Sequence, residues 1–137
     1  MAEAESAGLT PVARVVEDAV VRMVPASSVL EVAEMLSSAN VGAVVLGDAT
    51  TTTGIVSERD VVRAVAERRD LATTRAVEVG QVSLLWCDAS STVAEVADLM
   101  MEHYVRHVLV EEDGALVGVV SARDLLGVYA SAEEVTA

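Results

Sequence analysis

The chain of 137 residues contains no lysine, no phenylalanine, one cysteine and two prolines, and only 2% of its residues are aromatic. A single cysteine, Cys87, excludes a disulfide bond within the chain. Because aromatic residues are so few, valine, alanine, leucine and methionine must form the core. No uninterrupted apolar run approaches the roughly 20 residues that span a bilayer, and the N-terminal stretch lacks the basic start and apolar centre of a secretory signal. We therefore expect a cytoplasmic protein that does not enter the membrane.

Basic residues are also scarce, which gives a formal net charge of −13 and a pI of about 4.3. Nucleic-acid phosphates require a basic surface, so this balance argues against DNA or RNA as a partner. Hydrophobic residues make up 53% of the chain and charged residues 23%, a composition typical of a globular protein. This apolar content must be buried within the chain or between subunits.

One short segment occurs twice. "GIVSERD", from Gly54 to Asp60, returns as "GVVSARD" from Gly118 to Asp124, 64 residues further on. The same offset aligns "SVLEVAEML", which begins at Ser28, with "TVAEVADLM". Since no gap is needed between Ser28 and Val62, the chain consists of two copies of one unit.

Each copy has the same predicted order of elements. A serine or threonine followed three residues later by glutamate, the pattern of a capping box, begins a helix at Ser28 and at Thr92. Two short β-branched runs follow and predict a hairpin, and the Ser-x-x-Asp patterns at Ser57 and Ser121 begin another helix. Short strands near residues 20–24 and 83–87 precede the first helices. The order is β-α-β-β-α, an α/β (α+β) fold, and we expect the two pseudo-symmetric units to pack sheet to sheet, because roughly 60 residues rarely sustain one core alone.

The Ser-x-Arg-Asp corner between strand and helix has two interpretations. Serine and aspartate three residues apart can be a helix cap and nothing more. However, the corner also presents free backbone N–H groups and the positive end of a helix dipole, both of which attract anions. Arginine suits phosphate and is not required for capping, and an acidic residue can accept hydrogen bonds from ribose hydroxyls. The candidate residues are Ser57, Arg59 and Asp60 in the first copy and Ser121, Arg123 and Asp124 in the second.

From Val12 to Ala130, the repeated unit that ends in these corners resembles a tandem pair of CBS domains, the Bateman module. The resemblance implies that the corners bind adenosine ligands such as AMP, ADP or ATP, with S-adenosylmethionine and NADH as further candidates, and that no cofactor is required. It assigns the ribose to Asp60 and Asp124. It also implies that the serines lie beside the phosphate, that the arginines reach phosphates, and that the protein is a homodimer.

The two copies differ at the start of the second strand. Gly42 and Ala43 in the first copy align with Arg106 and His107 in the second, and the latter pair resembles the phosphate-contacting version of the family. A surface ion pair for Arg106 and core packing for His107 are the alternatives.

The start of each copy resembles the segment that lines the adenine pocket. This comparison selects Met23 and Val24 in the first copy and Trp86 and Cys87 in the second. Core packing is the alternative for all four, and Trp86 could equally contact a second subunit.

No catalytic site is predicted. His103 and His107 have a spacing that suits a metal, but the helix is expected to end near Glu102, which places them on different elements. Cys87 has no nearby histidine in the sequence, and neither a glycine-rich phosphate loop nor a hydrolase elbow occurs.

We expect a flexible acidic segment at residues 1–11, a first CBS unit at 12–66, a linker at 67–78, a second CBS unit at 79–130 and a tail at 131–137. The functional hypothesis is a regulatory, energy-sensing module that transmits nucleotide occupancy to an unknown effector protein. The alternative is a structural dimerisation module whose corners are only helix caps.

Overall fold

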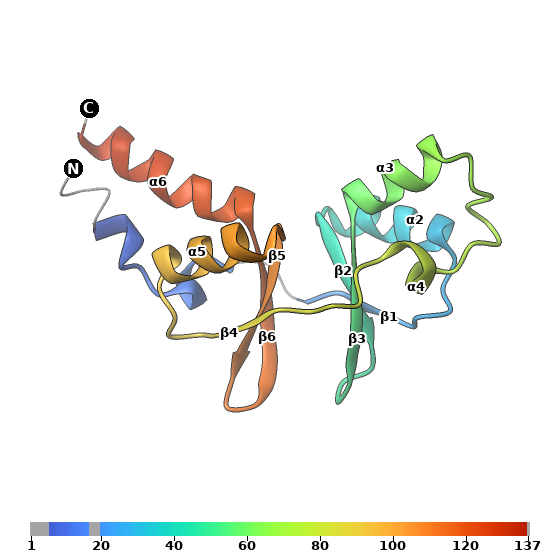
Figure 1. Ribbon diagram of the computed structural model, residues 1–137, viewed down its shortest axis with the longest axis horizontal. Helices are drawn as coiled ribbons and strands as arrows, with labels where there is room; N and C mark the ends of the chain where they lie inside the picture. Colours follow the sequence, from blue (N-terminus) through green and yellow to red (C-terminus); the bar gives the residue numbers. More distant parts are fainter. Residues whose placement is uncertain (1–5, 17–19, 137) are drawn as a thin grey trace. The chain divides into compact units, whose positions relative to one another are not determined.

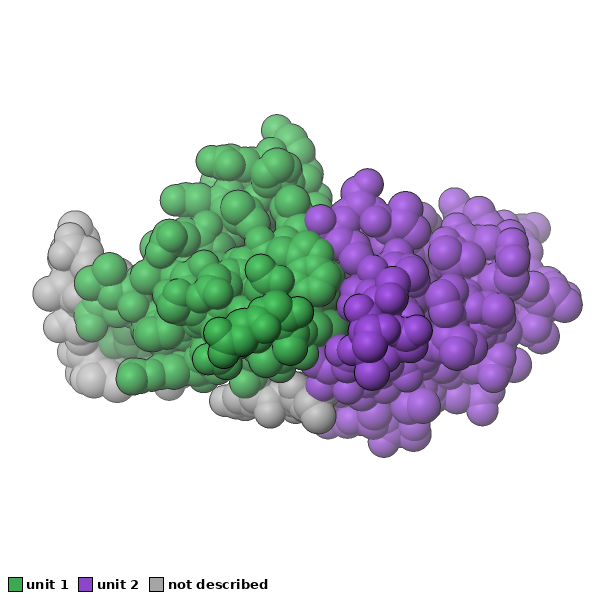
Figure 2. Space-filling view, turned by 90° about the horizontal axis from the view of Figure 1, so that it is seen from below, with its two compact units in different colours: residues 1–19, 85–137 green, residues 20–84 purple. Residues whose placement is uncertain are grey.

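A computed structural model describes residues 6–16 and 20–136, with side chains up to residue 132 (Figure 1). The chain forms two compact units (Figure 2). The first-copy unit contains residues 20–84, and the second-copy unit contains residues 85–137 together with the segment that precedes residue 20.

The first-copy unit is built on a three-stranded sheet of order β1-β2-β3. Strands β1 and β2 are parallel, and β2 and β3 form an antiparallel hairpin. Its elements are β1 (Arg22–Met23), α2 (Val29–Ala39), β2 (Ala43–Gly47), β3 (Thr52–Ser57), α3 (Glu58–Ala66) and α4 (Ala76–Val79).

The second-copy unit repeats this plan on a sheet of order β4-β5-β6. Its elements are η1 (Val12–Arg14), β4 (Trp86–Asp88), α5 (Val93–His103), β5 (His107–Glu112), β6 (Ala115–Ser121) and α6 (Ala122–Thr136). The predicted α/β class and the repeated β-α-β-β-α order are therefore confirmed, although the leading strands are shorter than expected.

The predicted capping boxes begin the first helix of each copy. Ser28 Oγ accepts from the Glu31 N–H at 3.0 Å, and Glu31 Oε1 accepts from the Ser28 N–H at 2.9 Å. Thr92 and Glu95 make the same reciprocal pair at the start of α5. Each box satisfies two of the N–H groups that a helix start leaves unpaired, so local sequence alone fixes these boundaries.

Valines dominate the two cores, as the composition requires. The first-copy core contains Val29, Val32, Leu36, Val44, Leu46, Val56, Ala64, Ala76 and Val79. The second-copy core contains Val12, Ala89, Val93, Val96, Met100, Val108, Val110, Val120 and Leu125. None of these buried residues is aromatic, although Tyr129 packs against the second core, so aliphatic side chains from the helices and strands supply most of the buried area.

Each core includes residues from a segment that lies outside its own predicted copy. We name these the cover segments: residues 74–80 pack on the first-copy core, and residues 10–16 pack on the second-copy core. The Val93 N–H donates to the Thr10 carbonyl at 2.9 Å, and the Val29 N–H donates to the Thr74 carbonyl at the same distance. Val12 and Ala76, which are equivalent under the 64-residue offset, are both fully buried. Residues 10–16, most of which fall in the expected first unit, therefore complete the second core, and residues 74–80 complete the first.

Three segments expected to lie outside the two CBS units contain hydrogen-bonded or helical residues. Within the expected linker, residues 67–78, the start of α4 supplies Ala76 to the first core. In the segment expected to be flexible, residues 1–5 lie outside the described residues, whereas Ala7 is buried and Thr10 is hydrogen-bonded to the second-copy unit. The expected tail at 131–137 is helical through Thr136, because α6 continues past residue 130. In the described part of the chain, no helix is long and apolar enough to cross a membrane.

Candidate functional site

The second-copy corner lies where β6 ends at Ser121 and α6 begins. The Ser121 N–H donates to Asp124 Oδ2 at 2.8 Å, and the Asp124 N–H donates to Ser121 Oγ at 3.0 Å. Asp124 is exposed, and its Oδ1 has no hydrogen-bond or ion-pair partner among the residues that the structure describes. The cap therefore uses one carboxylate oxygen and leaves the other available to a donor from solution.

The tertiary structure brings Arg106 and His107 to this corner. The Ala122 N–H donates to the Arg106 carbonyl at 2.8 Å, and His107 pairs with Ser121 across β5 and β6. Arg106 precedes β5 and is exposed, as is Arg123, whereas His107 is partly buried. A carboxylate, a helix start and two exposed guanidinium groups thus belong to one corner, a combination that can accept from hydroxyls and donate to phosphate.

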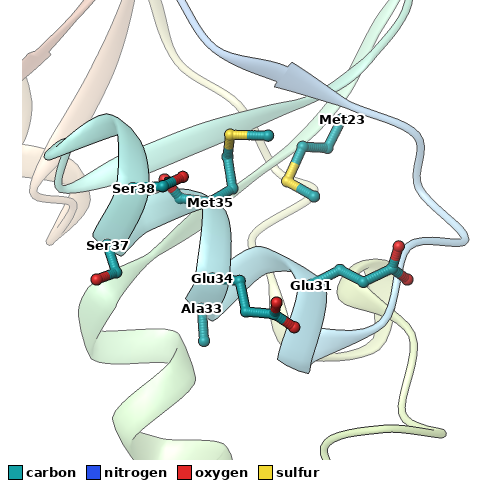
Figure 3. Close-up of a pocket in the computed structure, with 7 residues that line it drawn as sticks. All are labelled: Met23, Glu31, Ala33, Glu34, Met35, Ser37 and Ser38. Atoms are coloured by element: carbon teal, nitrogen blue, oxygen red, sulfur yellow. Dashed lines mark hydrogen bonds between the residues drawn. The ribbon is translucent and has the colours of Figure 1, made fainter.

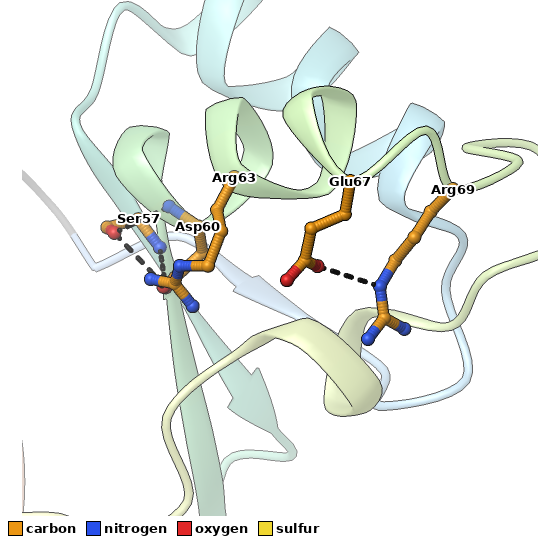
Figure 4. Close-up of polar contacts among 5 residues, drawn as sticks. All are labelled: Ser57, Asp60, Arg63, Glu67 and Arg69. Carbon is orange, nitrogen blue, oxygen red and sulfur yellow. Dashed lines mark hydrogen bonds and ion pairs between the residues drawn. The ribbon is translucent and has the colours of Figure 1, made fainter.

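The first-copy corner has the same capping bonds between serine and aspartate, but an arginine also donates to its carboxylate (Figure 4). Asp60 Oδ2 accepts from the Ser57 N–H at 2.9 Å and from Ser57 Oγ at 3.1 Å. Arg63 Nη2 donates to the other oxygen, Asp60 Oδ1, at 2.7 Å. Asp60 is only 9% exposed, and both of its oxygens are occupied. Arg59 is exposed, and the positions equivalent to Arg106 and His107 are Gly42 and Ala43, which carry no charge.

A surface hollow of about 700 Å³ lies beside α2 in the same unit (Figure 3). The residues that line it are Met23, Glu31, Ala33, Glu34, Met35, Ser37 and Ser38. None of them belongs to the first-copy corner. Hydrogen bonds from Ser28 hold the pKa of Glu31 below its ordinary value, so this carboxylate is charged at neutral pH. Two glutamates at the hollow make it unsuitable for a phosphate group.

The four residues selected for a base pocket lie at the leading strands. Met23 pairs with Leu46, and Cys87 pairs with Val110 in the equivalent position of the second sheet. Both are partly buried against their own cores, which agrees with the core-packing interpretation. Val24 is 63% exposed and Trp86 is 38% exposed, so these two side chains remain accessible to a ligand or a partner.

Cys87 is partly buried, and the two histidines His103 and His107 lie on different elements. Burial, assisted by the negative charges of Asp88 and Glu111, raises the pKa of the Cys87 thiol to about 11, which keeps it protonated at neutral pH. His103 ends α5 and His107 begins β5, as the sequence predicted. Within the described ranges, no cluster of three potential metal ligands is found.

Comparison with known proteins agrees with this geometry. Residues 12–67 and residues 76–131 each match the CBS domain, and the two matches begin 64 residues apart. The chain belongs to the CBS domain family. Its two CBS matches each begin within a cover segment, and they lie within three residues of the units expected at 12–66 and 79–130.

Individual proteins resemble the chain over most of its length. Hypoxic response protein 1 of Mycobacterium tuberculosis is 32% identical over 95 residues, which cover 68% of this chain and 66% of that protein. A CBS domain protein from Pyrobaculum aerophilum, solved in complex with AMP, is 30% identical with a TM-score of 0.75, and the match covers 89% of this chain and 99% of that one. A CBS domain pair solved with 5′-methylthioadenosine and S-adenosylmethionine shares the fold, with a TM-score of 0.77 at 20% identity over 90% of this chain and 98% of that one.

Sequence analysis missed Arg63. Its spacing of three residues from Asp60 places the two side chains on one helix face, a recognised ion-pair spacing that could have revealed the contact. The cover segments were also missed, although applying the 64-residue offset to Thr10 would have aligned it with Thr74.

Proposed function

We propose that this protein is a non-catalytic regulatory module that binds an adenosine-containing nucleotide of the AMP, ADP or ATP class. The ribose hydroxyls donate to Asp124 Oδ1, while Arg106, Arg123 and the start of α6 contact phosphate. Asp60 with Ser57 and Arg59 forms the equivalent first-copy corner, and the partly exposed Trp86 and Val24 are the remaining candidates to contact the base.

The observation that carries this proposal is the exposed Asp124 carboxylate with one oxygen unpartnered in the described structure. A cap requires only the oxygen that faces the helix start, so the second oxygen has no structural task. The AMP complex of the related Pyrobaculum aerophilum protein supports an adenosine ligand.

Occupancy would act by population shift. A ligand that binds one conformation of the module more tightly than another favours that conformation, and an effector protein that recognises it would respond. An energy-sensing role follows if AMP, ADP and ATP differ in the conformation that they favour.

A thermal-shift panel tests the proposal. Nucleotide-free protein is heated with AMP, ADP, ATP, NADH or S-adenosylmethionine. A ligand at about one hundred times its Kd stabilises the fold by about 2.7 kcal/mol, which raises the Tm by several degrees. We expect at least one adenosine nucleotide to produce this shift and Asp124→Ala to abolish it.

The matched control is Glu95→Ala, which removes the acidic member of the capping box at α5 and touches neither corner. It should lower the basal Tm as Asp124→Ala does, yet retain the ligand-induced shift. A flat panel for the wild type would reject nucleotide binding for these five ligands.

The alternative function, a structural dimerisation module, is favoured by one observation. Val62 on α3 and Leu126 on α6 occupy equivalent positions and are 65% and 68% exposed. A homodimer remains a prediction, and light scattering after size exclusion should give about twice the 14.3 kDa chain mass. A dimer whose stability no nucleotide alters would favour this alternative.

A further inference from the structure

The two corners differ in how their aspartates are engaged. Arg63 donates to Asp60 Oδ1 at 2.7 Å, and Ser57 donates to Oδ2, so each oxygen of this carboxylate already has a donor (Figure 4). In the second copy, the position equivalent to Arg63 is Gly127. Apart from the backbone of its own helix, a Cβ atom placed on Gly127 would meet no atom within 4 Å, so this position supplies no side chain to Asp124 and has room for one to begin.

The bond that Arg63 makes is difficult for a ribose to replace. A hydrogen bond between two charged groups is stronger than one from a neutral hydroxyl to the same carboxylate. A ribose hydroxyl that displaced Arg63 from Asp60 would therefore exchange a charged hydrogen bond for a weaker one. The same hydroxyl at Asp124 displaces only water, because Asp124 Oδ1 has no partner within the described structure.

We propose that Arg63 closes the first-copy corner to ribose and that the nucleotide is therefore held at the second-copy corner, where Gly127 leaves Asp124 open. This inference rests on the proposed nucleotide function. Arg63 acts as a specificity-determining residue, since it decides which of two otherwise similar corners accepts the ligand.

Isothermal titration calorimetry with AMP tests which corner binds the nucleotide. One set of variants removes the arginine from the first-copy corner, and another introduces an arginine at the equivalent position of the second. The wild type should bind one AMP per chain, and Asp124→Ala should abolish that binding. Arg63→Ala should add a second AMP per chain, which a further Asp60→Ala substitution removes. Arg63→Gln, which keeps the length of the side chain without its charge, provides a second test if Arg63→Ala folds poorly.

Gly127→Arg should place a guanidinium three residues after Asp124 and weaken AMP binding by about tenfold or more, as expected when a charged hydrogen bond must be broken. Gly127→Ala is the matched control, because it changes helix propensity without adding charge, and it should bind AMP as the wild type does. The thermal melts of the two Gly127 variants establish that both are folded.

Each outcome has a defined meaning. Two AMP molecules per wild-type chain, or one per chain in both Arg63 variants, would overturn the role of Arg63 while the nucleotide function stands. Equal AMP affinity in the two Gly127 variants would also overturn it. Absence of AMP binding in the wild type and every variant would instead reject AMP as the ligand, and the role of Arg63 in admitting it would be rejected as well.

Discussion

At the scale of single residues, the structure separates groups that the sequence presents as equivalent. Asp60 and Asp124 both end a Ser-x-Arg-Asp pattern, but the former is 9% exposed and ion-paired while the latter is exposed. Cys87 shows a comparable dependence on its surroundings. An ordinary thiol would begin to ionise near neutral pH, whereas burial beside Asp88 and Glu111 keeps this one protonated.

Alkylation with iodoacetamide should detect the raised pKa of Cys87. The rate should rise with pH toward a midpoint of about 11 in the folded protein, compared with 9.0 for an unperturbed thiol. Asp88→Asn removes one of the two negative charges and should lower this midpoint. A folded-state midpoint near the unperturbed value would contradict the environment described here.

The same shift predicts a loss of stability in alkali. Because the folded pKa lies above the unfolded value of 9.0, the contribution of the protonated thiol is fully present below that pH and is lost as the pH rises toward about 11. Urea unfolding at several pH values should show this loss for the wild type, and Cys87→Ser should show less of it. Equal alkaline slopes for the two proteins would argue against the linkage.

At the scale of elements, the contact between a cover segment and a strand sets a strict limit on side-chain size. A Cβ atom placed on Gly118, in β6, would lie 2.2 Å from Val16 Cγ1. Real Cβ contacts are not this short, so the valine or the backbone must move. Glycine at 118 is therefore required by the close approach of Val16 to the sheet rather than by a special backbone angle.

We predict that Gly118→Ala lowers the free energy of unfolding by about 1–3 kcal/mol, the usual cost of overpacking. Urea denaturation measures the change, and a second substitution, Val16→Ala, should recover part of it because it removes the nearest atom. Gly127→Ala, on a helix position with open space, is the control and should cause no loss. If Gly118→Ala left the free energy of unfolding unchanged, the close contact between Val16 and Gly118 would be contradicted.

At the scale of the whole molecule, the cover segments tie parts of the chain that are distant in sequence. The described residues before position 17 belong to the compact unit that contains residues 85–137, and Val12 is fully buried in the core of that unit. A change near the N-terminus should therefore affect the second copy of the repeat rather than the first.

Hydrogen exchange can test this connection with a matched pair of substitutions. Val12→Asp buries a charge in the second core, so the amides of β4, β5 and β6 should lose more protection than those of β1, β2 and β3. Val82→Asp makes the same change at a side chain that is 59% exposed and should leave both sheets protected. Unchanged exchange in β4 to β6 of Val12→Asp would disprove the packing.

The sequence by itself determined the repeat, the order of elements and the two corners. These features are local: capping boxes such as Ser28 with Glu31 are satisfied within four residues, and strand and helix periodicities are read over short windows. The Ser-x-Arg-Asp corners were found for the same reason, since a strand that enters a helix start needs only adjacent residues to define it.

Only the tertiary structure decided which core Val12 completes and which aspartate has an exposed carboxylate oxygen without a partner among the described residues. The placement of Val12 depends on backbone hydrogen bonds from its own cover segment to Ala89 and Ser91 and their neighbours, far along the chain, and local propensity carries no information about such contacts. Asp60 and Asp124 share one local pattern, yet their exposure follows from how Arg63 folds back and from the space at Gly127. Burial and ion pairing are properties of the packed molecule, so two copies of one Ser-x-Arg-Asp pattern have carboxylates with different exposure and different partners.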